Sequence, residues 1–408
     1  METLNKINEA RLFRMLAKSS ETGAIPGQGL RRLALSAEDK EMRNIFKAWC
    51  EEAGLMVKVD DFGNMYGRRE GKKNLPPVVL GSHLDSQPEG GRFDGVLGVL
   101  LALEVIHSLN DNEVDTERPI EIVNFTNEEG ARFEPPMLGS GGIAGVFDED
   151  YVHSRQDHDG FSFLDELKKI GYHGTKENRI KEFYSFVELH IEQGPILEDE
   201  NKQIGIVEGV QGISWLEVAL SGEADHAGPT PMHLRKDALM AAAEIMTQLE
   251  SKAIQAGVTV TVGKISVSPD TVNCIPGKAV FTIDLRSADD QKRSEAVKEA
   301  KSCIREVCQK RGVKVDIEEL WDTGKADFDK HITNIIEKNA ENLHYSSKRL
   351  LSGAGHDAKY VNNLGPTAMI FLPSVNGKSH VPSELTEDDD IVKGANVLYQ
   401  MALELANE

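Results

Sequence analysis

Between residues 76 and 130, short apolar segments alternate with a helical segment, and polar residues follow directly where the apolar segments end. Residues 77–80 (Pro-Val-Val-Leu) have the length and composition of a buried strand. Residues 96–106 carry apolar side chains at helical spacing, and residues 120–125 are the next apolar strand. Strands that alternate with helices favour an α/β layer with mostly parallel pairing. The chain is therefore expected to contain an α/β domain whose strands end in polar residues.

With 408 residues, the chain is too long for one compact core, so two domains are expected. From about residue 212, the segments follow the order strand, helix, strand, strand, helix, strand, which is the ferredoxin-like split pattern. The predicted strands are 215–220, 258–267, 279–285 and 313–320, and the predicted helices are 234–254 and 294–311. We therefore predict an inserted α+β domain at residues 212–328. An α/β domain would be formed by residues 1–211 and 329–408.

Three further segments have clear local signals. Ser36 is a plausible N-cap for a helix that carries Ile45, Phe46 and Trp49. Residues 163–170 are expected to form one short helix, and residues 186–191 another strand.

The overall charge and the cysteine pattern limit the partners and the compartment. The formal net charge of −21 argues against a nucleic-acid or anionic-membrane partner, because both require a basic surface. The N-terminus is polar, and the longest apolar run, residues 96–106, is shorter than the ~20 residues of a membrane span. The four cysteines form no CxxC pair, which fits a reducing compartment. These features predict a cytoplasmic protein.

Five imidazole and carboxylate side chains stand out as candidate metal ligands: His83, Asp94, Glu129, His190 and His380. Zinc, manganese, cobalt and nickel accept such ligands. Two ions ~3.5–4 Å apart need a bridging carboxylate, which Asp94 in its glycine-rich loop can supply. A single histidine is more often a surface or satisfied core residue, and Asp94 alone could be a helix N-cap. His83, His190 and Glu129 lie at predicted strand ends, where α/β proteins place ligands, and this favours the metal interpretation, although His380 lies in a loop.

Glu128 and Glu129 are adjacent carboxylates that follow the strand 120–125 and precede Gly130. Adjacent carboxylates often lie on a solvated turn. Here both can face one pocket, so one can bind metal while its neighbour deprotonates a water molecule. We assign Glu129 as the ligand and Glu128 as the general base.

These motifs resemble the di-metal aminoacylase and carboxypeptidase superfamily, and within it the hydantoinase/carbamoylase-type amidases. That branch contains N-carbamoyl-L-amino acid hydrolases, β-ureidopropionases and allantoate amidohydrolases. The resemblance extends over nearly the whole chain. It rests on the segments 31–33, 81–85, 91–95, 128–133, 190–194, 225–228, 273–277, 352–357 and 379–382.

The resemblance implies a role for each matching residue. The metal ligands would be His83, Asp94, Glu129, His190 and His380, with two divalent ions per subunit, manganese or zinc, with cobalt or nickel as further options. Glu128 would be the general base, Asp85 would orient His83, and His226 would stabilise the oxyanion in a neighbouring subunit. The substrate-binding residues would be Gln193, Asn273, Arg286 and Gly355. The expected fold is a catalytic α/β domain with an inserted ferredoxin-like domain that acts as lid and forms a homodimer.

His190 discriminates within the superfamily, because peptidase and aminoacylase branches usually have a carboxylate at this position. The resemblance therefore implies hydrolysis of a ureido or carbamoyl C–N bond, in allantoate or in an N-carbamoyl-L-amino acid. Three segments, 270–273, 352–357 and 371–377, look closer to allantoate amidohydrolases. Two alternatives stay open: a metallo-dipeptidase or aminoacylase on the same metals, and a non-catalytic metal-binding protein, against which an intact Glu128 argues.

Overall fold

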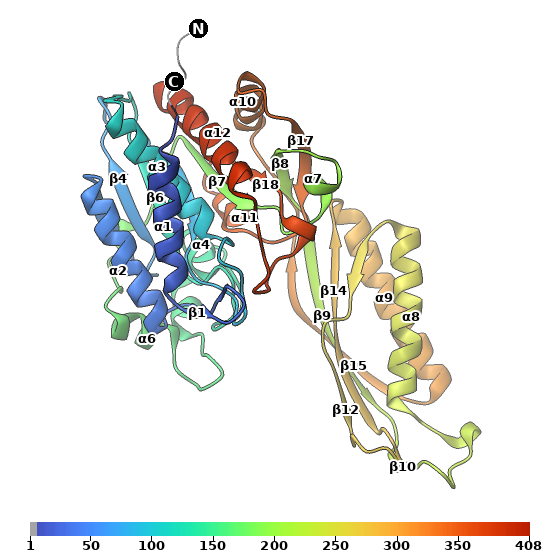
Figure 1. Ribbon diagram of the computed structural model, residues 1–408. Helices are drawn as coiled ribbons and strands as arrows, with labels where there is room; N and C mark the ends of the chain where they lie inside the picture. The colour runs from blue at the N-terminus through green and yellow to red at the C-terminus, as the bar shows by residue number, and fades with distance from the viewer. Residues whose placement is uncertain (1–5) are drawn as a thin grey trace. The chain divides into compact units, whose positions relative to one another are not determined.

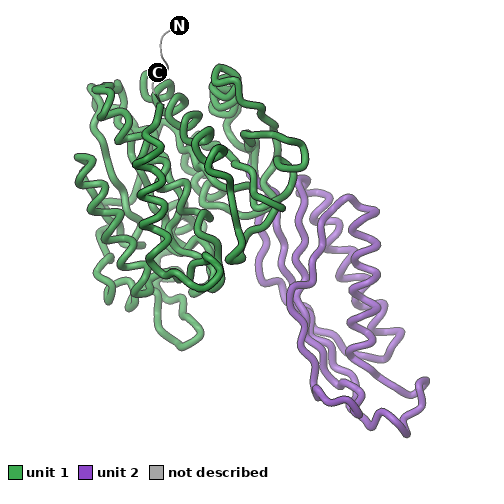
Figure 2. The backbone as a smooth tube through the Cα atoms, viewed as in Figure 1, with its two compact units in different colours: residues 1–209, 327–408 green, residues 210–326 purple. Residues whose placement is uncertain are grey.

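The computed structural model describes residues 6–408, which fold around two hydrophobic cores. Unit 1 is formed by residues 1–209 and 327–408, and unit 2 by residues 210–326 (Figure 2). Unit 1 is therefore discontinuous in sequence. No helix within residues 6–408 is both long enough and apolar enough to cross a membrane.

Unit 1 is built on a nine-stranded mixed sheet with the order β16-β8-β18-β7-β5-β6-β4-β3, in which β17 also pairs with β8 (Figure 1). Its strands are β3 (Met56–Val59), β4 (Met65–Arg69), β5 (Val78–His83), β6 (Ile120–Phe125), β7 (Ser185–Ile191), β8 (Ile204–Val210), β16 (Ala326–Asp327), β17 (Ser347–Ser352) and β18 (Thr367–Leu372). A small separate ladder joins β1 (Ala24–Ile25) to β2 (Gly29–Leu30).

Parallel pairing is found at the centre of this sheet. Strands β18, β7, β5 and β6 run parallel, whereas β8 pairs antiparallel with β18, and β4 pairs antiparallel with β6 and β3. The sequence pattern predicts mostly parallel pairing, and this holds for the central strands but not for β3, β4 and β8. The difference arises because β3 and β4 are joined by a short turn, which can only connect antiparallel neighbours. Every residue of β5, β7 and β18 is buried.

Helices of unit 1 pack against this sheet and against one another. They are α1 (Glu9–Glu21), α2 (Ala37–Glu52), α3 (Val96–Asp111), α4 (Leu138–Ile143), α5 (Glu149–Ser154), α6 (Phe163–Ile170), α7 (Ile196–Asp199), α10 (Lys330–Asn342), α11 (Asp357–Val361) and α12 (Asp388–Asn407). Helix α3 packs on β5, β6 and β7 and also contacts α1 and α12. The predicted cap is confirmed, because the Ser36 side chain accepts a hydrogen bond from the N–H of Asp39 at the start of α2.

Unit 2 has the predicted ferredoxin-like order of elements. Its elements are β9 (Gly212–Ser221), α8 (Ala238–Ala256), β11 (Thr259–Thr261), β12 (Ile265–Ser268), β14 (Lys278–Ser287), α9 (Asp290–Arg311) and β15 (Lys314–Thr323). The antiparallel sheet has the order β11-β14-β9-β15, with β12 also on β14. Side chains of β9 and β14 alternate between buried and half-buried, and both helices pack on this sheet. A short ladder joins β10 (Asp225–His226) to β13 (Cys274–Ile275).

Two predicted boundaries in unit 2 are wrong. The single strand expected at 258–267 is interrupted after Thr261 and forms the two strands β11 and β12, which pair with successive parts of β14. The helix expected from residue 234 begins at Ala238, because the Asp237 side chain caps its first turn by accepting a hydrogen bond from the N–H of Met240. Hydrophobic periodicity alone does not reveal either break.

Candidate metal centre

The central parallel strands of unit 1 end at one edge of the sheet, and the candidate ligands lie at this edge. His83 is the last residue of β5, and His190 lies near the end of the neighbouring strand β7. Glu128 and Glu129 follow the end of β6, which pairs with β5 on its other side. His380 lies in the segment after β18, which pairs with β7. Four adjacent strands therefore deliver these side chains to one place, as is typical of ligand sites in α/β sheets.

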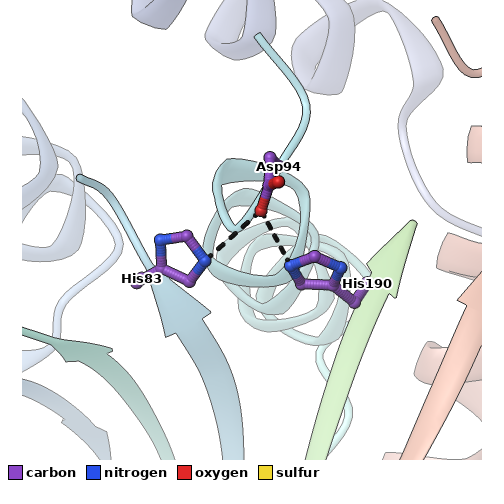
Figure 3. Close-up of side chains that lie close together, drawn as sticks. All are labelled: His83, Asp94 and His190. Carbon is purple, nitrogen blue, oxygen red and sulfur yellow. Dashed lines mark ion pairs between the residues drawn. The ribbon is translucent and has the colours of Figure 1, made fainter. Parts of the chain in front are cut away.

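Asp94 lies between two groups of ligands and presents one carboxylate oxygen to each. Its Oδ1 is 3.5 Å from Nε2 of His83 and 3.1 Å from Nε2 of His190 (Figure 3). Its Oδ2 is 3.4 Å from Nε2 of His380, which lies 3.5 Å from Oε2 of Glu129. In each group the potential ligand atoms lie within 4.8 Å of one another. This is the arrangement that a carboxylate bridging two ions requires.

Asp94 does not serve as the cap of helix α3. The N-cap of α3 is Gly95, which has φ 65°, and no side chain caps this helix end. The carboxylate of Asp94 is directed at the imidazoles instead (Figure 3). The metal interpretation of this residue is therefore favoured over the cap interpretation.

The two buried histidines present Nε2 to Asp94 because Nδ1 is occupied. Nδ1 of His83 lies 3.0 Å from the carbonyl oxygen of Asp85, and Nδ1 of His190 lies 2.9 Å from the carbonyl oxygen of Ile191. A carbonyl accepts hydrogen bonds, so each Nδ1 carries the proton and each Nε2 offers a lone pair. Nε2 of His83 is buried and has no hydrogen-bond partner among residues 6–408. A buried lone pair of this kind fits a metal ligand.

Burial and close contact shift the pKa values of this cluster. Burial alone would raise the pKa of Asp94, but its contacts with the imidazoles of His190, His380 and His83 outweigh burial and hold this pKa well below its usual range. Burial, followed by the charge of Asp94, raises the pKa of Glu129 to about 7. Burial lowers the pKa of His380, but its contacts with Asp94 and Glu129 outweigh this and raise that pKa to about 9. Oxygen and nitrogen donors of this kind suit divalent ions of borderline softness.

Glu128 lies beside the ligands without belonging to either group. Its Oε2 is 3.6 Å from Nε2 of His83, and burial raises its pKa well above the usual range. The backbone N–H groups of Glu128 and Glu129 donate to the two carboxylate oxygens of Asp85, each at 3.3 Å. The Asp85 carboxylate itself is 3.7 Å from Nδ1 of His83. Asp85 thus holds the imidazole mainly through its carbonyl and the two glutamates through its carboxylate.

A third buried group, Glu188, His190 and His356, is also close enough to hold an ion. Its atoms are engaged within the protein, however. The carboxylate of Glu188 accepts hydrogen bonds from Ser82 Oγ at 2.6 Å and from the N–H of Ala358 at 2.9 Å. Nε2 of His356 contacts a serine hydroxyl at 3.0 Å. These contacts satisfy the hydrogen-bonding atoms of Glu188 and His356. The group is therefore better described as buried polar packing next to His190 than as a metal site.

Two of the predicted substrate-binding residues lie in unit 1. Nε2 of Gln193 donates to Oδ2 of Asp94 at 2.8 Å and lies 3.2 Å from Nε2 of His380. Its Oε1 is buried and has no hydrogen-bond partner in the part of the chain that the structure describes. Gly355 immediately precedes His356, whose ring packs on that of His190 with centroids 4.5 Å apart. Both residues therefore belong to the surroundings of the ligand cluster.

The other two, Asn273 and Arg286, lie in unit 2, together with His226, the predicted oxyanion donor. His226 is exposed in β10, and its Nδ1 accepts a hydrogen bond from the N–H of Gly228 at 3.1 Å. Asn273 is exposed just before β13, and its carbonyl accepts from the N–H of Ala227. Arg286 lies in β14, where its Nε and one terminal nitrogen donate to the carboxylate of Asp284. The β10–β13 ladder therefore places His226 and Asn273 on neighbouring segments.

Comparison with known proteins identifies the family. Residues 79–404 match peptidase family M20/M25/M40. The chain is 43% identical over 404 residues to the N-carbamoyl-L-amino-acid amidohydrolase of Rhizobium meliloti, covering 98% of this chain and 97% of that one. It is 36% identical over 394 residues to the allantoate amidohydrolase of Escherichia coli K12, covering 95% of each. The chain belongs to peptidase family M20/M25/M40.

Solved structures place this M20/M25/M40 member within one branch. A crystal structure of a hydantoinase/carbamoylase family amidase from Burkholderia multivorans matches with a TM-score of 0.92 and 42% identity, over 99% of both chains. The predicted resemblance to hydantoinase/carbamoylase-type amidases is confirmed. So is the predicted fold class, an α/β domain with an inserted α+β domain.

The site of this M20/M25/M40 protein also contains residues that sequence reasoning missed. Nε2 of Gln87 donates to Oε2 of Glu129 at 2.7 Å. Glu384 is only 3% exposed and accepts hydrogen bonds from the backbone of the loop that carries Asp94. Both follow a predicted ligand by four residues, His83 and His380 respectively. That proximity is the only available signal, and it does not specify a contact.

Proposed function

We propose that this chain is a metal-dependent amidohydrolase that cleaves the ureido or carbamoyl C–N bond of a small carboxylate. The substrate is allantoate or an N-carbamoyl-L-amino acid, and the products include ammonia and carbon dioxide. The observation that carries the proposal is Asp94, shared by two ligand groups beside the buried carboxyl group of Glu128. The names of the Rhizobium and Escherichia relatives support the substrate class.

Two divalent ions would be held by the two ligand groups. His83, His190 and Oδ1 of Asp94 would bind one ion, and His380, Glu129 and Oδ2 of Asp94 the other. Manganese or zinc is the expected ion, and cobalt or nickel would also suit these donors. When bound, such ions polarise a substrate carbonyl and lower the pKa of a water molecule.

Glu128 transfers protons in this reaction. Burial raises its pKa well above the usual range, and carboxyl groups with a raised pKa are typical of general acid–base catalysis. It takes a proton from the attacking water and delivers it to the departing nitrogen. Water adds to the ureido carbon, the C–N bond breaks, and the resulting carbamic acid decomposes to ammonia and carbon dioxide.

The substrate carboxylate is recognised by Arg286 together with Asn273. A guanidinium group can donate two parallel hydrogen bonds to a carboxylate, and the contact with Asp284 fixes its orientation. Gln193 and Gly355 line the ureido end of the pocket, next to the ligands. Oε1 of Gln193, which lacks a hydrogen-bond partner among the described residues, is available to accept from a ureido N–H.

His226 donates a hydrogen bond to the carbonyl oxygen on which negative charge develops. Because its Nδ1 accepts from Gly228, the neutral ring carries its proton on the exposed Nε2. We place this contact in the active site of a second copy of the chain, in a homodimer formed through unit 2. The four cysteines, all free, fit a cytoplasmic enzyme.

An ammonia-release assay with added manganese tests the proposal. The substrates are allantoate, N-carbamoyl-L-amino acids, 3-ureidopropionate and, for comparison, dipeptides and N-acetyl amino acids. Turnover of a ureido or carbamoyl acid, with none of the peptides, is expected. Turnover of dipeptides or N-acetyl amino acids alone would replace the proposal by a peptidase or aminoacylase. No hydrolysis of any amide by protein loaded with both ions would indicate a non-catalytic metal protein.

A further inference from the structure

A buried carboxylate, Glu384, connects two segments that carry metal ligands. Its Oε1 accepts hydrogen bonds from the backbone N–H groups of Phe93 and Asp94, at 3.2 Å and 3.1 Å. Its Oε2 accepts from the hydroxyl group of Ser379 at 2.8 Å. Both carboxylate oxygens are therefore used, and the segments that they join are separated by nearly 300 residues in sequence.

The glycine at position 91 makes room for this carboxylate. A Cβ atom on Gly91 would overlap Oε1 of Glu384. The glycine-rich loop before Asp94 is therefore not open space left for an ion, because Glu384 fills the position that a side chain would take. The loop and Glu384 fit each other closely, so the backbone path that leads to Asp94 depends on Glu384.

The second carboxylate oxygen of Glu384 holds the segment that carries His380. Ser379 donates to Oε2 of Glu384, and its Oγ also lies 3.2 Å from Oδ2 of Asp94. His380 follows directly and has φ 57°, a backbone conformation that a residue with a side chain adopts only when its surroundings hold it. Its ring is half-exposed, so packing of the imidazole alone does not fix it. The Ser379–Glu384 contact supplies part of this restraint.

We propose that Glu384 is a positioning residue that sets the distance between Asp94 and His380, and so determines the affinity for the ion on the His380 side. The inference rests on the proposed metal centre but not on the identity of the substrate. His83 and His190 are held by backbone carbonyls and do not contact Glu384, so the ion on their side should be affected less. Partners that orient metal ligands typically contribute 10–100-fold in metal affinity.

Metal retention by the full-length chain tests the proposal without any activity measurement. Protein loaded with manganese is dialysed against increasing chelator, and bound manganese per chain is measured by elemental analysis. The wild type should hold two ions. Glu384→Ala should release one of them at roughly 10–100-fold lower chelator concentration and keep the other. Glu384→Gln should resemble the wild type, because its amide oxygen can still accept from both backbone N–H groups.

The matched control is Asp60→Ala. Asp60 is a buried carboxylate of unit 1 that also accepts from two backbone N–H groups, those of Phe62 and Asn64, but it lies in the β3–β4 turn. The Asp60→Ala variant should keep both ions up to the same chelator concentrations as the wild type. Equal loss of manganese affinity in Asp60→Ala and Glu384→Ala would show that the effect comes from general instability. That result would overturn the proposal. So would unchanged retention in Glu384→Ala.

A second variant covers the case in which Glu384→Ala does not fold. Ser379→Ala removes one of the three hydrogen bonds that Glu384 accepts, and it should lower the affinity for the same ion by a smaller factor. Wild-type retention in Ser379→Ala would then overturn the proposal. A wild type that binds no manganese would instead contradict the proposed metal centre, so the two failures are distinguishable.

Discussion

At the scale of single residues, the chemistry of the site depends on which atom of each side chain faces inward. His83 and His190 offer Nε2 because a backbone carbonyl occupies Nδ1, and Asp94 divides its two oxygens between two ligand groups. Glu128 lies within the cluster but outside both groups. Ligation and proton transfer are therefore assigned to different side chains, and substitutions can separate them.

Glu128→Gln should abolish turnover and leave manganese bound. The amide has the same size as the carboxyl group but cannot accept a proton, and general acid–base catalysis typically contributes 10²–10⁴-fold. Elemental analysis and kinetics on one preparation measure both properties. The matched variant Glu129→Gln should lose metal as well as activity. If Glu128→Gln stays fully active or loses its ions, the assignment of the base is wrong.

Arg286→Lys should impair substrates with a free α-carboxylate far more than their amide analogues. A lysine ammonium cannot reproduce two parallel hydrogen bonds to a carboxylate. The ratio of kcat/KM between each acid and its amide, for wild type and variant, measures the effect. Asp284→Asn is the companion variant, because it disturbs the orientation of the guanidinium while keeping its charge. Equal losses on acids and amides would assign Arg286 a structural role.

At the scale of elements, the loop before α3 depends on how closely this helix approaches the sheet. A Cβ atom on Gly98 of α3 would overlap the carbonyl oxygen of Leu189 in β7. The loop that carries Asp94 leads directly into α3, so a displaced helix displaces the Asp94 carboxylate. Close packing of this kind does not tolerate an added methyl group without rearrangement.

Gly98→Ala should therefore lower both the free energy of unfolding and the metal content. An unhindered glycine-to-alanine change within a helix would instead stabilise it by ~1 kcal/mol. Gly394→Ala in α12 is the control, because its Cβ would meet side-chain atoms of Leu372, which can shift more easily than backbone. Thermal unfolding and elemental analysis distinguish the cases, and a more stable Gly98→Ala protein with full metal content would contradict the packing argument.

The turn between β3 and β4 should add a pH dependence to stability. Burial raises the pKa of Asp60 from 3.8 to about 6. The folded state thus binds this proton more tightly, so the contribution to stability is fully present below about pH 4 and is lost as the pH rises through about 6. The unfolding free energy of the wild type, relative to Asp60→Asn, should fall by up to ~3 kcal/mol over this range.

Urea unfolding at several pH values measures this difference. Trp49 belongs to unit 1 and the other two tryptophans to unit 2, so fluorescence in a Trp215→Phe, Trp321→Phe background reports on unit 1. A difference between wild type and Asp60→Asn that does not change with pH would show that Asp60 keeps an ordinary pKa.

Features that depend on a local sequence pattern are predicted well from the sequence. The strands that carry His83 and His190 end at or next to these residues, as expected, and Ser36 caps its helix. The sequence does not predict contacts between distant segments, such as Glu384 with the backbone of Asp94, because no local periodicity encodes them. The break between β11 and β12 could not be predicted from the sequence for a related reason. Both segments are apolar enough to be predicted as strand, but their pairing with β14 decides where each strand ends.

At the scale of the whole molecule, the candidate catalytic residues are divided between two units. The ligands and Glu128 belong to unit 1, whereas His226, Asn273 and Arg286 belong to unit 2. If a homodimer completes each site with His226 from a second copy, two different inactive variants should complement each other. This outcome is not expected of a monomeric enzyme.

Mixing His226→Ala with Glu128→Gln under conditions of subunit exchange tests this. Half of the randomly formed dimers are mixed, and in those one of the two sites combines intact Glu128 with intact His226. About a quarter of wild-type activity should therefore return. Each variant alone should stay inactive, since losing one oxyanion donor costs ~10²–10³ in turnover. Confirmed exchange without any recovery would rule out a shared site.

The position of β18 in the sheet has a consequence for how the protein is made in the cell. β18 lies between β7 and β8, and it is followed in the chain by the segment with His380. Until the ribosome has released residues 367–372, β7 and β8 each expose an unpaired backbone edge, a feature that promotes aggregation. Unit 2 is synthesised in full during this interval. The nascent chain is therefore expected to need chaperone protection until residues 367–372 have emerged, and it can assemble the proposed metal centre only after His380 has followed.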